Sequence, residues 1–300
     1  MRNSVTGISR GFIIFAQVFG TMFAIIGLIA YCALLDDVIK GLGNGSNDNI
    51  AAKASAGAIM ALIVYFVWKS VWSCVVIIRS MNEMDDFTLS ANKWIISALS
   101  LTVGGFFTPF IISSFPNIKV SATIKPKPFL TKAFGMFMVV GAPLAMLTYG
   151  IYMRNNMGGA AQGWTIAVFA ISGFLLVLGA LNVGFFYQKN ANQKYESSTF
   201  MKLLANTTLV IVTLELVFVM LEAVLRLLAN LYRMIYEFSQ NGFLWGLLAL
   251  VNFMFVMIYV LFVIRLTWET ITGIWADEVE FNVFEPLKDY QKDQKNSQFA

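Results

Sequence analysis

The sequence predicts an all-α protein, a polytopic integral membrane helix bundle with six or seven spans and a cytoplasmic C-terminus. Of its 300 residues, 58% are hydrophobic and only 13% are charged. Soluble globular domains are roughly 45–50% apolar, so this chain lies well outside that class. The mean hydropathy is +0.71, and most of the charged residues lie between long apolar runs. That distribution is typical of a multi-pass protein of the cell membrane.

Seven apolar segments follow one another along the chain, each with the roughly 20 residues that a 30 Å hydrocarbon core requires. They cover residues 11–35, 55–78, 94–115, 133–153, 164–187, 203–229 and 243–266. The first is longer than the apolar region of a signal peptide, which has roughly 7–15 residues, so we interpret it as a retained span. Because the connections are short, we divide the chain into a transmembrane helix bundle, 1–266, and a cytoplasmic interfacial helix with a charged tail, 267–300.

The third segment has two interpretations. Gly104, Gly105 and Pro109 near its middle favour a bend, so this segment either spans the membrane or re-enters it from the cytoplasmic side. With seven spans, and Lys69 left out, 13 Lys and Arg residues lie inside and 7 outside. With six spans and both termini inside, the division is 15 to 5. The positive-inside rule favours the six-span form, and the C-terminus is cytoplasmic in both.

The sixth segment and its continuation, residues 200–241, carry a line of polar side chains that we call the stripe. On a helix with 100° per residue, its members fall within roughly 60° of one line; they are Thr208, Glu215, Glu222, Arg226, Arg233 and Glu237. Apolar side chains fill most of the remaining circumference, with Thr213 as an exception. Ionisable groups inside a bilayer are costly, so the stripe is the first candidate for a functional site.

Four charged residues lie within the apolar segments: Lys69, Glu215, Glu222 and Arg226. Left unpaired at mid-bilayer, each costs roughly 2.5–3.5 kcal/mol, so they cannot all face lipid. Glu222 and Arg226 can pair one helical turn apart. Glu215 and Lys69 lie too deep to reach the membrane surface, and we predict that Lys69 approaches Glu215 across the bundle interior. Amide side chains within other segments can extend this network; they are Gln17, Asn182 and Asn252.

Two functions fit this charge network. In the first, a desolvated Glu215 takes up and releases a proton while Arg226 or Lys69 tunes its pKa, so the protein is a transporter or an ion-conducting protein. In the second, the same groups only hold helices together. The protein would then be a non-catalytic membrane subunit of a larger complex, one that anchors or couples to a soluble ATPase motor.

Other functions find no support in the residues. The chain has no histidine, which removes His-assisted nucleophiles and most zinc sites. It has no GxxxxGK[ST] phosphate loop and no GxGxxG motif. Its two cysteines, Cys32 and Cys74, lie in apolar segments, where free thiols behave as small hydrophobes. We expect no enzymatic activity, cofactor, metal site or nucleic-acid partner.

The polar connections predict where the chain meets the membrane surface and its partners. A basic loop, residues 119–132, carries four cations; they are Lys119, Lys125, Lys127 and Lys132. Each contributes roughly 1 kcal/mol near anionic headgroups. The same loop and the charged tail, residues 277–300, can alternatively dock a cytoplasmic protein. Between the last apolar segment and the tail, Trp268 and Trp275 recur on one helix face at headgroup level.

Two local patterns resemble known proteins. Arg226-Leu227-Leu228-Ala229-Asn230 resembles the R-L-x-[GA]-N signature of subunit a, the ion-translocating stator of rotary ATP synthases. The resemblance implies that Arg226 faces a rotor ring and that Asn252 lines the ion path, although the proline that precedes the arginine in that family is missing. Residues 94–117 resemble uncharacterised multi-spanning membrane proteins of small wall-less bacteria, which implies no particular activity.

Overall fold

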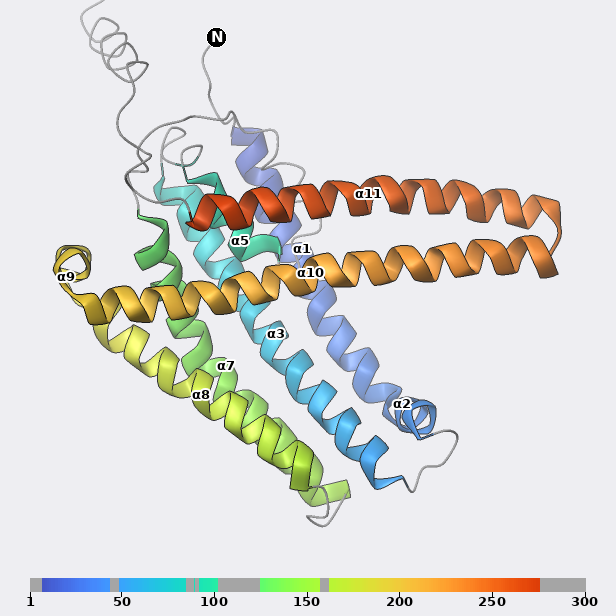
Figure 1. Cartoon of the computed structure of the whole chain (residues 1–300), viewed down its shortest axis with the longest axis horizontal. Coiled ribbons are helices and arrows are strands. Elements are labelled where there is room, and N and C mark those ends of the chain that lie inside the picture. The colour runs from blue at the N-terminus through green and yellow to red at the C-terminus, as the bar shows by residue number, and fades with distance from the viewer. Residues whose placement is uncertain are drawn as a thin grey trace, which may run out of the picture.

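The structure is a computed structural model that describes residues 7–43, 49–84, 89, 92–101, 125–156 and 162–275. Within these residues the chain forms nine helices and no strands, which confirms the predicted all-α class. They are α1 (Gly7–Ala33), α2 (Leu35–Leu42), α3 (Ile50–Glu83), α5 (Lys93–Leu101), α7 (Pro126–Asn156), α8 (Gln162–Phe186), α9 (Ala191–Ser197), α10 (Thr199–Gln240) and α11 (Phe243–Trp275). Figure 1 shows their arrangement.

Six of the described helices are long and apolar enough to cross a membrane: α1, α3, α7, α8, α10 and α11. They mark the chain as a multi-pass membrane protein. Helix α5 has nine residues, about 14 Å at 1.5 Å per residue, which is too short to span the hydrocarbon core by itself. The rest of the third predicted segment, 102–115, lies outside the described residues. The choice between six and seven spans, and the cytoplasmic C-terminus, therefore stay predictions.

Helix α10 extends well beyond the segment predicted at 203–229. It has 42 residues, and at 1.5 Å per residue it is about 63 Å long. Ser198 caps its start by accepting a hydrogen bond from the Met201 backbone N–H at 3.3 Å. No glycine or proline interrupts the chain before Gly242, whose φ of 85° favours glycine and ends the helix. The helix therefore covers nearly all of residues 200–241, the stretch on which the stripe was predicted, because polar residues after Arg226 do not break a helix.

Helices α10 and α11 form a long antiparallel hairpin that crosses the other long helices obliquely and extends past them (Figure 1). Helix α11 passes the boundary predicted at residue 266 without a break and ends at Trp275. We call residues 217–259, the outer part of the hairpin, the arm. Only Ala223 and Gly246 are buried within it. The arm is thus a pair of helices that contact each other and leave most of their side chains exposed.

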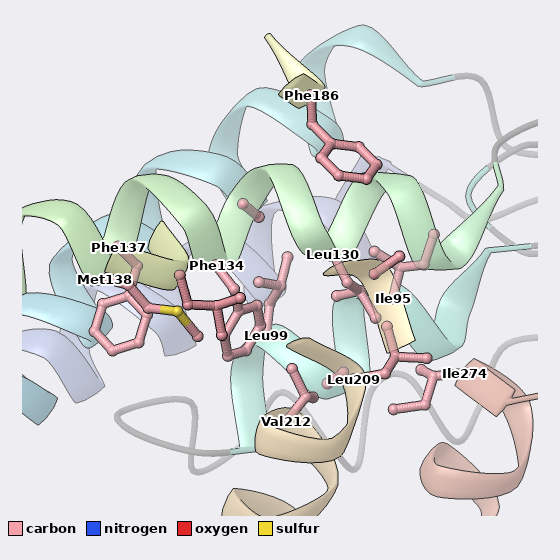
Figure 2. Close-up of a cluster of buried hydrophobic side chains, with 14 of the residues drawn as sticks. Ile95, Leu99, Leu130, Phe134, Phe137, Met138, Phe186, Leu209, Val212 and Ile274 are labelled. Carbon is pink, nitrogen blue, oxygen red and sulfur yellow. The ribbon is translucent and has the colours of Figure 1, made fainter. Parts of the chain in front are cut away.

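The part of the core that holds the hairpin lies where α5, α7 and the inner parts of α10 and α11 meet. Figure 2 shows side chains from these helices turned toward one another. They include Ile95, Leu99, Leu130, Phe134, Phe137, Met138, Leu209, Val212 and Ile274. Inside a bilayer such contacts stabilise through close van der Waals packing rather than removal from water. The core therefore fixes the inner half of the hairpin against α5 and α7 and leaves the arm outside it.

Helices α7 and α8 approach closely because glycines lie at their contact. A Cβ atom added to Gly179 would lie 2.7 Å from Cβ of Met138, 2.9 Å from the backbone nitrogen of Val139 and 3.0 Å from the carbonyl oxygen of Gly135. A Cβ atom on Gly135 would lie 2.6 Å from Cβ of Asn182. Small residues allow two membrane helices to pack backbone to backbone. This contact fixes α8, and with it Asn182, beside α7.

Candidate functional site

A lysine of α3 and a glutamate of α10 form an ion pair inside the bundle. Nζ of Lys69 donates a hydrogen bond to Oε2 of Glu215. The two side chains are only 1% and 10% exposed. The residues are 146 positions apart in the chain, so tertiary packing alone brings them together. The predicted approach of Lys69 to Glu215 across the bundle interior is confirmed.

Aromatic side chains of α3 and α7 surround this pair. Nζ of Lys69 lies 4.7 Å from the ring centroid of Phe134 and 5.7 Å from that of Phe137, distances at which a cation is attracted to a ring face. The Tyr65 ring packs 4.6 Å from Phe137. The Tyr65 hydroxyl and the Trp68 indole N–H are buried and have no hydrogen-bond partner among the described residues. In such surroundings either charge alone would be costly, so each depends on the other.

A second polar contact joins the stripe to α8. Nδ2 of Asn182 donates to Oγ1 of Thr208 at 2.8 Å, and both residues are fully buried. Thr208 lies on the stripe, seven residues before Glu215, so the inner half of the stripe faces the bundle along two turns. The same hydroxyl donates to the carbonyl of Leu204 at 2.9 Å. Asn182, an amide that we predicted to extend the network, therefore contacts the stripe at Thr208, two helical turns before Glu215.

Replacing Thr208 by valine is expected to lower the free energy of unfolding by about 1–3 kcal/mol, because the buried Asn182 amide then loses its acceptor. Thr207→Val is the matched control. Thr207 is only partly buried, and its hydroxyl donates to the carbonyl of Leu203 at 2.9 Å, as Thr208 does to Leu204. The control should change stability by less than about 0.5 kcal/mol. Equal losses in both variants, measured by denaturant titration in mixed micelles, would show that the Asn182 contact contributes nothing.

Most of the outer half of the stripe is exposed, and only Glu237, at 19%, is largely covered. Nε of Arg226 donates to Oε1 of Glu222 at 2.7 Å, one turn apart as predicted, but the two side chains are 66% and 59% exposed. Arg233 and Glu237 form a similar pair at 3.8 Å. The members of the stripe follow one line along α10, but the two halves of that line differ in burial. Its inner half is buried against the bundle, and its outer half lies on the arm.

In the described part of the chain, the other two candidate amides form no hydrogen bond with the Lys69–Glu215 pair. Nδ2 of Asn252 donates to Oδ1 of Asn230 at 2.9 Å on the arm. Asn230 is 15 residues, or about 22 Å, beyond Glu215 along α10. Gln17 is fully buried on α1, and its amide has no hydrogen-bond partner within the described chain. One turn further, Thr21 bonds to Ser70, the neighbour of Lys69, at 2.9 Å between hydroxyl oxygens.

Sequence reasoning missed several contacts that fix the inner hairpin. Nε1 of Trp275 donates to Oγ1 of Thr213 at 2.7 Å and ties α11 to α10. The hydroxyls of Ser97 and Thr270 lie 2.8 Å apart and tie α5 to α11. The isolated position of Thr213, away from the stripe on an otherwise apolar face, was a usable signal for the first contact. Ser97 and Thr270 gave none, because single hydroxyls are common within apolar helices.

The basic residues of the 119–132 loop that the structure describes contact aromatic and acidic side chains near the start of α7. Lys125 pairs with the exposed Glu196 of α9, and this cation holds the pKa of the Glu196 carboxyl below its ordinary value. The pair therefore favours the folded state at neutral pH and loses that effect as the pH falls and Glu196 takes up a proton. Lys127 lies over the Trp275 ring and Lys132 over the Tyr187 ring. Lys119 and the 277–300 tail lie outside the described residues.

Within the described part of the chain, no three Asp, Glu or Cys side chains come together in a way that could hold a metal ion. No protein-family model matches the chain, and neither a curated protein nor a solved structure matches it. The similarity to subunit a thus rests on residues 226–230 and the position of Asn252. Here the arginine pairs with Glu222 within its own helix, and Asn252 contacts Asn230.

Proposed function

We propose that this protein is a transporter or ion-conducting protein of the cell membrane, and that Glu215 is its protonatable group with Lys69 as counter-ion. The observation that carries this proposal is the buried Lys69–Glu215 pair. Lys69 lies 19 residues after the start of α3 and 14 residues before its end, or about 28 Å and about 21 Å at 1.5 Å per residue, so it is far from both ends of this helix. Ionisable residues at such depth commonly mark proton or ion pathways.

The surroundings of the pair are compatible with two states, one with Glu215 ionised and one with Glu215 protonated. With Glu215 ionised, the carboxylate holds the Lys69 ammonium and the two charges cancel. When Glu215 takes up a proton, its negative charge is lost and the hydrogen bond weakens. The ammonium then keeps its contacts with the Phe134 and Phe137 rings, which attract a cation without neutralising it. Protonation thereby changes the force between α3 and α10, and this coupling is what a proton-driven transporter requires.

Proton uptake into vesicles tests this proposal. Purified protein is reconstituted with an internal pH-sensitive dye, and a potassium diffusion potential drives proton entry. Glu215→Gln is expected to lower the protein-dependent uptake rate by about 100-fold, the lower end of the effect of removing a proton-transfer group. Because Lys69 is then unpaired, the variant must first be shown to remain monodisperse and helical.

Glu222→Gln is the matched control, because it makes the same change seven residues further along the stripe on the exposed arm. It should conduct at the rate of the unmodified protein. Equal losses in the two variants, or full uptake by Glu215→Gln, would contradict the assignment of Glu215. Unmodified protein that admits protons no faster than empty vesicles would contradict proton conduction.

A second candidate, a non-catalytic membrane subunit of a larger complex, is favoured by a different observation. The arm leaves most of its side chains exposed, and basic side chains gather near the start of α7. Extraction of the native protein in a mild detergent, followed by identification of what purifies with it, tests this candidate. A stoichiometric soluble partner that is lost when residues 277–300 are removed would favour it over a self-contained transporter.

A further inference from the structure

The arm carries an exposed ion pair, Glu222–Arg226, that is surrounded by large apolar side chains. Glu222 and Arg226 lie near the middle of the 42 residues of α10, and Phe218, Leu221 and Leu225 around them are more than half exposed. The bond within the helix engages Nε and NH2 of Arg226 and Oε1 of Glu222. A guanidinium has five N–H donors and a carboxylate can accept about four hydrogen bonds, so one pair uses only part of this capacity.

Lipid tails cannot complete these hydrogen bonds, so a surface that covers the pair must supply both a donor and an acceptor. The described surfaces of the other long helices mostly lack such groups at mid-helix. Helices α1 and α8 present large apolar side chains such as Phe23 and Phe174. Exposed charges on α3, α7 and α11 lie toward the helix ends; they include Arg79, Glu83, Arg154, Arg265 and Glu269. The arm itself, with an acid and a base one turn apart, has the complementary groups.

We propose that two copies of this chain associate through their arms, with Glu222 of each copy against Arg226 of the partner subunit. Such a contact is isologous, because the same patch serves on both sides of a two-fold axis. It is self-complementary, because two arms that cross near Val224 place one acid and one base of each copy at the crossing. Four charges then share their hydrogen bonds, and none remains toward lipid.

The shape of the hairpin is compatible with this contact. Helix α10 is about 63 Å long and the hydrocarbon core is about 30 Å thick, so a helix that stays within the core must lie steeply tilted. The oblique course of the hairpin across the other helices is visible in Figure 1. Two tilted arms related by an axis along the membrane normal cross each other. Once their crossing angle exceeds 90°, each Glu222 is nearer to Arg226 of the partner subunit than to the partner's Glu222.

Charge-swap complementation tests the proposal. Glu222→Arg makes the patch wholly basic and Arg226→Glu makes it wholly acidic, so each variant alone repels its own copy. Self-association is measured in vesicles by energy transfer between donor- and acceptor-labelled full-length copies over a range of dilutions in lipid. Each single variant is expected to dissociate at roughly tenfold higher protein density than the unmodified chain. A mixture of the two variants is expected to associate again, within about threefold of the unmodified chain.

The Arg265–Glu269 pair on α11 provides the control, since it is another exposed pair with the same i,i+4 spacing. Glu269→Arg and Arg265→Glu should leave self-association unchanged. Unmodified protein that stays monomeric at all densities overturns the proposal. Single variants that associate normally, or a mixture that fails to recover, also overturn it, and the last result would point to a different membrane protein as the partner of the arm.

A cross-linking experiment covers the case in which the charge variants do not accumulate. Ala229 is exposed on the arm one turn beyond Leu225, and Ala229→Cys in a Cys32→Ser background leaves both charges in place. Residue 229 lies five residues, about 7.5 Å, beyond the crossing, so the cysteines are joined by a bifunctional thiol reagent with a flexible spacer rather than by a direct disulfide. A cross-link between two copies in native membranes supports the arm contact. Phe174→Cys on the exposed face of α8 is the control, and equal cross-linking at both positions, or none at residue 229, overturns the proposal.

Discussion

Replacing Lys69 by methionine is expected to lower the free energy of unfolding by about 3–5 kcal/mol, because the Glu215 carboxylate is then left buried without a counter-charge. Methionine keeps the length and the apolar stem of the lysine and removes the ammonium with its attraction to the Phe134 and Phe137 rings, so the loss reports on the charge rather than on lost volume. The measurement is a denaturant titration in mixed micelles, in which the circular-dichroism signal of the helices reports unfolding. A loss below about 1 kcal/mol would contradict the buried ion pair.

The double variant Lys69→Met/Glu215→Leu separates the structural role of the pair from its functional role. Replacement of a whole buried ion pair by apolar residues of similar size is often neutral or stabilising by about 1–4 kcal/mol. We therefore expect the double variant to be at least as stable as the unmodified protein, while its proton uptake is lost. Full uptake by this stable variant would show that the pair only holds the helices together.

Gly179→Ala is expected to cost about 3 kcal/mol, the upper part of the range for overpacking a close contact. The added Cβ would lie within 3.0 Å of the Val139 nitrogen and the Gly135 carbonyl oxygen. Both are backbone atoms, so no change of side-chain rotamer relieves the overlap and α8 must move away from α7. Because α8 carries Asn182, the bond from Asn182 to Thr208 should weaken with it. Thermal unfolding in detergent and the yield of monodisperse protein measure the effect.

Gly184→Ala is the matched control on the same helix. A Cβ atom at Gly184 meets nothing within 4 Å, so the substitution adds no overlap. Alanine is also the better helix former by roughly 0.8–1.0 kcal/mol. The control should therefore unfold at the same or a slightly higher temperature than the unmodified protein. If Gly179→Ala behaves like Gly184→Ala, the close α7–α8 contact is not a determinant of stability.

The fold class could be predicted from the sequence because membrane spans follow from local composition. Each span needs only its own residues to be long and apolar, and six helices of the structure meet that condition. Helix ends do not coincide with the ends of the apolar segments. The apolar part of the sixth segment ends near 229, but the stripe was predicted to continue on the same helix to Glu237, and the helix runs to Gln240 because its first glycine is Gly242. Polarity indicates where a helix leaves lipid, and backbone chemistry determines where it ends.

The sequence alone determined that Lys69 and Glu215 need a partner, because an unpaired charge in a bilayer is too costly. It also determined the Glu222–Arg226 pair, which depends only on one helical turn. The tertiary structure decided which part of the stripe is buried. All its members share one face of α10, but Lys69 and Asn182 reach only the inner half. Burial depends on residues far away in the chain. The sequence of residues 200–241 shows that Glu215 lacks the i,i+4 partner that Glu222 has, but it does not show that Glu222 and Arg226 are exposed.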